Sequence, residues 1–263
     1  MVNISKGDLK MQNQKRLIEQ RRQKYHQVDC EPYKVTFYMK NEVCLNDYLM
    51  FDSLLAYCVM KDIFQKNYEN VTNSDELFDV PLPLKRTGKI WHASAGIFEV
   101  IDTDQGSWKK RWDNQNENLV NPHRKRTGKY SLKIDVGSGK NKAYSMPLQL
   151  YLTRKIEFYV NGDGPEIMRL LGNYISAVGK KRSQGYGFVQ KMEIKKIDKD
   201  KSIFKDGKIM RPITTETLIN EFENKNELKM DYQRRYMPVK PPYWNASESI
   251  AAAAPKFINV IGE

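Results

Sequence analysis

The sequence predicts an α+β fold in which strands and helices share one core. Three segments lead to this expectation: residues 33–39 alternate between apolar and polar, 165–178 repeat apolar residues at helical spacing, and 188–194 alternate again. Alternation is typical of strands, and steps of three and four residues are typical of amphipathic helices. With 263 residues, the chain is long enough to bury a large core in one domain or two small ones.

The first half of the predicted core is a strand followed by a helix. The inward face of the strand would comprise Tyr33, Val35, Phe37 and Met39. Asn46 or Asp47 can cap a helix over about 48–65, which would bury Leu54, Leu55, Cys58 and Val59. A strand followed by such a helix is the opening half of a ferredoxin-like unit.

Several more strands are expected in the middle of the chain, around 89–100, 129–136, 143–152 and 155–162. Residues 102–129 break this pattern and predict an insertion between core strands. The insertion carries two tryptophans and two basic triplets, namely Trp108, Trp112, Lys109, Lys110, Arg111, Arg124, Lys125 and Arg126. Such tryptophans can stack nucleic-acid bases beside the cations that pair with phosphates, or they can anchor the loop to the domain. Both readings stay open.

The second helix leads into a glycine-rich turn. Asp163 or Gly164 can cap this helix, Pro165 suits its first turn, and Gly179 is expected at its end. The turn over 179–187 comprises Gly179, Lys180, Lys181, Arg182, Ser183, Gln184, Gly185, Tyr186 and Gly187. Its glycines allow a backbone to approach another chain closely, its cations can hold a polyanion, and its tyrosine can stack a base. An ordinary solvated surface loop is the alternative.

The overall charge favours a polyanionic partner. The formal net charge is +12, which suits nucleic acid. A membrane is not expected as a partner, since no apolar run is long enough to span one and no signal core is present. Three cysteines, Cys30, Cys44 and Cys58, form no C-x-x-C motif, which favours reduced thiols in the cytoplasm over a zinc site. No cofactor is expected.

Two segments flank the predicted core at 31–200. Residues 1–30 form a basic arm, for which a helix ordered by a partner and a floppy extension are both open. Residues 201–263 form a C-terminal extension with a helix near 214–229 and a proline-rich tail, and we expect it to pack on the core.

The helix, the run GKKRSQGYGFV and the following strand resemble the glycine-rich loop region of the CRISPR-associated RAMP superfamily. Three further segments, PLPLKR at 81–86, IWHASAGIF at 90–98 and PPYW at 241–244, resemble its Cas-five-like subunit of type IV systems, the Csf-three kind. The resemblance implies a ferredoxin-like (RRM-like) RAMP domain in an RNA-binding subunit without catalytic activity.

The same resemblance implies what the protein binds. The subunit would hold the 5′ handle of the guide RNA and cap the backbone filament, next to a Cas-seven-like backbone subunit and other CRISPR effector subunits. Contact with target DNA stays open. Beyond the turn and the insertion, the expected RNA-binding residues include Lys85, Arg86 and His92.

A metal-independent endoribonuclease that processes the guide precursor is the alternative function. The histidines His26, His92 and His123 form no metal-binding motif. RNA cleavage without metal needs a general base for the attacking 2′-hydroxyl, and His92 beside Trp91 is the best candidate. We favour a packed or hydrogen-bonding histidine at this position, and therefore a binding protein.

Overall fold

The computed structural model describes residues 6–45, 47–70, 79–111, 123–124, 128, 130–131, 136–223, 231–243, 245–256 and 259–261. Among the predicted site residues, Trp112, Lys125 and Arg126 lie outside these ranges, as does the proposed helix cap Asn46. Of Arg124 only the backbone is described.

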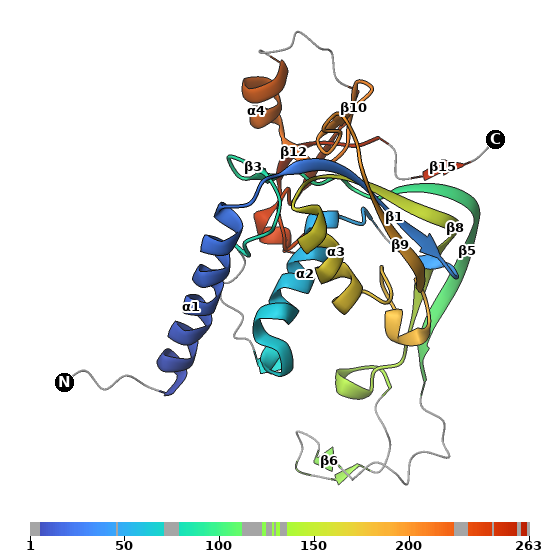
Figure 1. Cartoon of the computed structure of the whole chain (residues 1–263). Helices are drawn as coiled ribbons and strands as arrows, with labels where there is room; N and C mark the ends of the chain where they lie inside the picture. Colours follow the sequence, from blue (N-terminus) through green and yellow to red (C-terminus); the bar gives the residue numbers. More distant parts are fainter. Residues whose placement is uncertain are drawn as a thin grey trace.

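One mixed sheet forms the centre of the fold, in the order β15-β5-β8-β1-β9 (Figure 1). Its strands are β1 (Glu31–Met39), β5 (Ile97–Lys110), β8 (Tyr144–Gly162), β9 (Val189–Lys196) and β15 (Asn259–Ile261), and the short β2 (Val43–Cys44) also pairs with β8. All these pairs are antiparallel except β15 with β5. Two helices, α2 (Phe51–Phe64) and α3 (Gly164–Tyr174), lie together on one face of the sheet. The expected α+β class is confirmed.

The core lies between this sheet and the two helices. Alternation along β1 and β8 turns Val35, Phe37 and Phe158 inward, where all three are fully buried. The rings of Phe37 and Phe158 meet edge to face, with centroids 5.2 Å apart. The helices close the core with Leu55, Cys58, Ile167, Leu170 and Leu171.

The helix caps differ partly from expectation. Asp163 caps α3 as predicted, since its Oδ1 accepts the Glu166 amide at 3.1 Å. The predicted end at Gly179 is wrong, because α3 stops at Tyr174 and residues 177–178 pair instead with 187–188. Asp47 does not cap α2 either. The helix begins after Met50, where the Phe51 amide donates to the carbonyl of Ser94.

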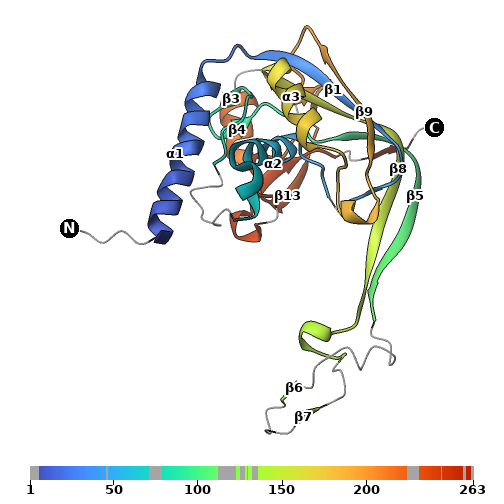
Figure 2. The same cartoon turned by 60° about the horizontal axis from the view of Figure 1, so that its bottom comes forward.

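The expected insertion is partly strand. β5 runs on through Lys110 and pairs with β8 as far as Tyr144, so these strands form a long arm that projects from the body (Figure 2). Residues 143–152 and 155–162 belong to one strand and not to two. The two predicted strands join at Thr153, where the pairing of β8 with β5 shifts in register. The buried Thr153 hydroxyl lies within hydrogen-bonding distance of the carbonyls of Glu99 and Lys155 at this point. The described part of the arm's end holds β6 (His123–Arg124) paired with β7 (Tyr130–Ser131), the only strand within the predicted 129–136 segment.

The segment before the arm is also less regular than predicted. The expected strand at 89–100 divides into β4 (Ile90–Trp91), which pairs with β3 (Arg86–Thr87), and the start of β5. Between them the chain crosses to the end of the main sheet, where Ala93 bridges Val160 and Ala95 bridges Met50. The small residues permit these close backbone approaches, because bulkier side chains would not fit between the crossing chains.

Both flanking segments contact the core. The basic arm contains a helix, α1 (Lys6–His26), which lies beside α2 and α3 and buries Ile18 and Tyr25. The C-terminal extension contains β10 (Phe204–Lys205), β11 (Lys208–Ile209), β12 (Ile213–Thr214), β13 (Gln233–Met237) and β14 (Ile250–Ala254). Its predicted helix is short, with α4 (Thr215–Thr217) continuing as the π-helical turn η6 (Leu218–Glu223). Among the described residues, short 3-10 turns occur at η1 (Gln65–Asn70), η4 (Gly139–Asn141), η5 (Arg182–Gln184) and η7 (Ala246–Glu248).

Arg211 joins the C-terminal extension to the core. Its guanidinium is almost fully buried and ion-pairs with Asp52 of α2 at 3.0 Å. It also donates to the carbonyls of Ala93 and Val239 and to the hydroxyl of Tyr243. The proline-rich tail therefore packs against its own chain at this point.

Candidate nucleic-acid interface

The glycine-rich loop is held firmly at both ends. The Lys180 amide donates to the carbonyl of Cys44, and the Gly187 amide donates to the carbonyl of Glu42, each at 2.8 Å. Between these anchors the chain makes the turn η5 (Arg182–Gln184), flanked by Lys181 and Gly185 in the left-handed backbone region. The exposed cationic turn is therefore presented from a fixed frame.

The three glycines have different roles. A Cβ on Gly187 would lie 1.9 Å from the carbonyl oxygen of Val178, and a Cβ on Gly179 would lie 2.7 Å from that of Cys44. Both glycines thus allow close approach within the chain itself. Gly185 has a φ of +96° and open space around it. It is the one glycine of this loop where the backbone can be approached from outside.

The structure brings the loop and the arm together. The Lys181 ammonium lies 4.2 Å from the centroid of the Trp108 ring, a cation–π contact. Trp108 also donates its indole N–H to the Tyr144 hydroxyl at 3.0 Å. Beneath this contact, Trp108 and Tyr186 pack against a buried cluster of Cys44, Leu148 and Leu150. Trp108 is therefore half-buried and anchored while one side of its ring supports the loop cation.

A groove of about 400 Å³ runs between the loop and the start of α2. Its cations are Lys180 and Arg182, and its aromatic side chains are Tyr48, Tyr57 and Tyr243. These five residues are called the loop groove below. The Arg182 guanidinium lies 5.3 Å from the Tyr57 ring centroid. Flat rings beside cations are what single-stranded nucleic acid requires for base stacking and phosphate pairing.

The loop cations are not neutralised by the described residues. No ion pair there joins Lys180, Lys181 or Arg182 to a carboxylate. Asp47, which also lines the groove, pairs instead with Arg235 at 3.1 Å. The exposed Ser183 and Gln184 complete the outer surface of the turn. The loop therefore keeps a net positive charge that a polyanion can satisfy.

The remaining predicted site residues do not join the loop groove. Lys109 alternates with Trp108 along β5 and so lies on the opposite face of the arm, whereas Lys110 shares the Trp108 face. Arg111 is exposed and follows the end of the strand. Arg86 begins β3 and Lys85 directly precedes it. This strand lies next to α1, at the far end of the helical layer from η5 (Figure 1). Arg86 ion-pairs with Asp79 at 3.1 Å and lies over the Trp91 ring.

His92 is buried and its ring is fully engaged within the chain. Its Nδ1 lies 2.8 Å from Asp200 Oδ2, and its Nε2 lies 2.8 Å from Thr87 Oγ1. Partial desolvation of Asp200 opposes its ionisation, but hydrogen bonds from His92, Ser202 and Asn161 outweigh this and hold its pKa well below the ordinary value. The ring thus connects β3 with the segment after β9 and is not exposed beside the loop.

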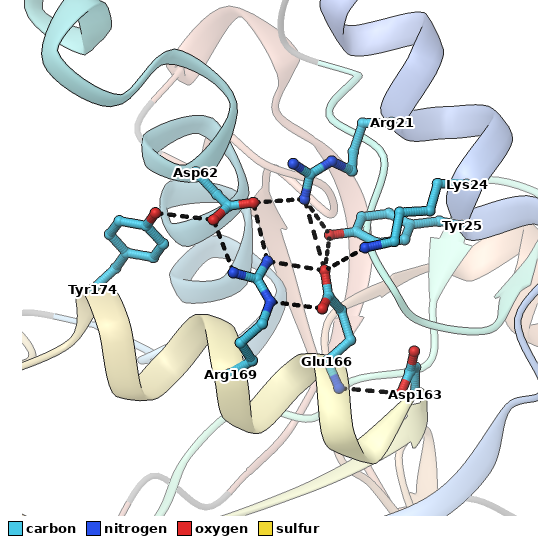
Figure 3. Close-up of polar contacts among 8 residues, drawn as sticks. All are labelled: Arg21, Lys24, Tyr25, Asp62, Asp163, Glu166, Arg169 and Tyr174. Carbon is cyan, nitrogen blue, oxygen red and sulfur yellow. Dashed lines mark hydrogen bonds and ion pairs between the residues drawn. The ribbon is translucent and has the colours of Figure 1, made fainter.

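An ionic cluster between α1, α2 and α3 was not anticipated from the sequence (Figure 3). Arg169 bonds both oxygens of Asp62 at 3.0 Å and reaches Glu166 at 2.8 Å. Arg21 of α1 adds an ion pair with Asp62 at 2.7 Å, and Tyr25 donates to Glu166 at 2.9 Å. In the sequence, the i,i+3 spacing of Glu166 and Arg169 indicates only the ion pair between these two residues.

The cluster shifts the pKa values of its carboxylates downward. Hydrogen bonds from Arg169 and Arg21 hold the pKa of Asp62 well below its ordinary value. Burial opposes ionisation of Glu166, but bonds from Arg169 and Tyr25 outweigh it and also lower its pKa. Both carboxylates are therefore charged at neutral pH and fix α1 against the other two helices.

Two negative findings apply to the described residues alone. No group of three or more His, Cys, Asp and Glu side chains among them is arranged to hold a metal ion. None of their helices has the length and apolar character needed to cross a membrane.

The fold and the loop surface define an α+β protein with a mixed, mostly antiparallel core sheet and an exposed cationic loop beside aromatic rings. The sequence matches the family described as CRISPR type IV associated protein Csf3 over residues 31–255, and the chain belongs to this family. A search of curated proteins finds no match. The resemblance stated from the sequence is thereby confirmed, and α1 precedes the matched region.

Proposed function

We propose that the chain is a non-catalytic RNA-binding subunit of a type IV CRISPR ribonucleoprotein. In this role it holds the 5′ handle of the guide RNA and caps the backbone filament. Its partners are the guide RNA, a Cas-seven-like backbone subunit and other effector subunits in the cytoplasm, and target DNA is a secondary candidate. Membership of the type IV family supports this proposal.

The topology supports a ferredoxin-like RAMP domain. The core elements follow one another as β1, α2, β5, β8, α3 and β9, and the strands lie in the order β5-β8-β1-β9. This is the strand-helix-strand, strand-helix-strand arrangement with both helices on one face. The glycine-rich loop then joins the second helix to the fourth strand, which is the position implied by the resemblance.

The observation that carries the proposal is the loop groove with its uncompensated cations. Lys180 and Arg182 lie beside Tyr57, and Lys181 lies on the half-buried Trp108, so cations and aromatic rings occur together in one region. Phosphates bind the cations and release condensed counterions, whereas bases stack on the rings. A single strand of RNA offers both groups at close spacing.

Binding of a guide-like RNA at several salt concentrations tests this proposal. The triple change Lys180→Ala, Lys181→Ala and Arg182→Ala should lower affinity and reduce the salt slope by about 1 unit for each lost phosphate contact. A matched control removes the same formal charge from Lys195, Lys199 and Lys201. Equal effects of both triple variants, or a salt-independent affinity of the parent, would refute the loop as the RNA site.

The catalytic alternative rests on a different observation. Asp200, His92 and Thr87 form a hydrogen-bonded chain in which a carboxylate orients an imidazole, as in sites that use a general base. If this chain is catalytic, the protein cleaves repeat RNA in EDTA, and His92→Ala abolishes cleavage while RNA binding persists. Binding without cleavage supports the non-catalytic role.

A further inference from the structure

A second cavity, of about 420 Å³, lies between α1 and the segment that leads into β3 and β4. This volume is within the range of about 300–1,000 Å³ that is usual for small-molecule sites. The apolar part of its wall includes Tyr25, Val28, Leu82, Leu84 and Trp91. Its polar lining includes Arg22, His26, Lys85, Arg86 and Asp79. A lining that combines apolar side chains with cations suits a ligand that has a flat body and an anionic group.

Arg86 supplies a fixed flat surface in this cavity. Its guanidinium carbon lies 4.7 Å from the Trp91 ring centroid, and its NH1 bonds Asp79 at 3.1 Å. Arg22 of α1 secures the same site from the other side by donating to the Asp79 carbonyl at 3.0 Å. Nucleobases stack on guanidinium planes as well as on aromatic rings. The stacked Arg86 and Trp91 therefore offer a preorganised platform for a base.

The charge of the cavity favours a phosphate. Arg22 and Arg86 share the single carboxylate of Asp79. The Lys85 ammonium has no ion-pair partner among the described carboxylates, so a positive charge remains at the rim. The Cys30 thiol adds no negative charge, since burial raises its pKa. Phosphate is the anion that a lysine beside an arginine commonly binds.

We propose that this cavity binds a single nucleotide, with its base against Arg86 and Trp91 and its phosphate at Lys85. The choice of a nucleotide rests on the proposed RNA-binding function. The cavity is nevertheless separate from the loop groove, because the two share no lining residue. One of its walls comes from α1, which lies before the region matched to the family. The nucleotide is either free or the end of an RNA.

Protection of Cys30 from alkylation measures occupancy directly. Cys30 is half-buried in the cavity wall, whereas Cys44 and Cys58 are buried elsewhere and serve as internal controls. The full chain is treated with a maleimide, and labelling of each cysteine is followed by mass spectrometry. Adenosine, cytidine, guanosine and uridine monophosphates are tested separately beside inorganic phosphate. We expect at least one nucleotide to slow labelling of Cys30 severalfold, and phosphate alone to have no effect.

Two variants and two RNAs sharpen this test. Lys85→Ala should weaken nucleotide protection about tenfold, which corresponds to about 1.4 kcal/mol. Lys195→Ala is the matched control, because this exposed lysine lines neither this cavity nor the adjoining pocket that shares Arg86 and Trp91. A short RNA with a 5′-phosphate that protects better than its 5′-hydroxyl form identifies an RNA end as the ligand. Protection by monophosphates alone identifies a free nucleotide.

Three results would overturn the inference. They are unchanged labelling with every nucleotide and RNA, equal protection by inorganic phosphate, and equal affinity of the Lys85→Ala variant and the parent. These outcomes are independent of the loop groove. If the loop triple variant loses guide RNA while no nucleotide protects Cys30, the proposed function stands and the nucleotide site is refuted.

Discussion

Removal of one partner from the buried ion pair of Arg211 and Asp52 should strongly destabilise the fold. Asp52 has no exposed surface, and Arg211 retains only 1%. In Arg211→Met, an apolar side chain of similar length replaces the guanidinium, and the Asp52 carboxylate stays buried without its cation. The variant also removes the guanidinium donor from the carbonyls of Ala93 and Val239.

The expected magnitude follows from these losses. Removing one partner of a buried ion pair costs about 3–5 kcal/mol, because an uncompensated charge remains in the interior. The Tyr243 hydroxyl still donates to Asp52 at 2.8 Å, which favours the lower part of that range. Since the free energy of unfolding of a whole domain is only about 5–15 kcal/mol, this loss should clearly lower the midpoint of urea unfolding.

A double variant distinguishes the cost of an unpaired buried charge from the cost of lost packing. Arg211→Met combined with Asp52→Asn removes both charges, and it should recover part of the stability lost in the single variant. The assay is the midpoint and slope of urea unfolding for the parent, both single variants and the double variant. A loss below about 1 kcal/mol for Arg211→Met, the range of exposed pairs, would refute the reasoning. So would strictly additive effects of the two substitutions.

Three further predictions concern the helical cluster, the loop and the arm. The lowered pKa values of Asp62 and Glu166 mean that their stabilisation is present above the unfolded-state values near pH 4 and is lost as pH falls further. At acid pH, α1 should therefore detach from α2 and α3 and become accessible to limited proteolysis. In the Asp62→Asn variant, α1 should already be accessible to the protease at neutral pH. Gly187→Ala should destabilise the fold by several kcal/mol, because the new Cβ would clash with the Val178 carbonyl. Gly185→Ala should cost only about 1–2 kcal/mol, because only its left-handed backbone is unfavourable for alanine. The midpoints of thermal unfolding of the two variants should therefore differ, with Gly187→Ala the lower. Trp108→Ala should weaken RNA binding and also lower stability, since the ring both supports Lys181 and packs on the arm; loss of stability with unchanged binding would make it an anchor alone.

The sequence by itself determined the features that depend on local periodicity and on composition. Alternation at 33–39 placed β1, and helical spacing after Asp163 placed the start of α3. The polyanionic partner that the basic excess favours stays a prediction. The quoted motifs also placed the chain in its family. These signals survive folding because a strand face or a helix cap is set by neighbours within a few residues.

Only the tertiary structure decided which distant residues meet. Trp108 and Lys181 come together because the arm continues past the bulged register near Thr153, and no local pattern reveals that continuity. Gly187 allows close packing against Val178, which depends on how the loop folds back. Nothing in the sequence distinguished Arg211 and Asp52 from other charged residues, and only the fold buries them as an ion pair. Contacts of this kind depend on packing between elements far apart in the chain, which local spacing does not encode.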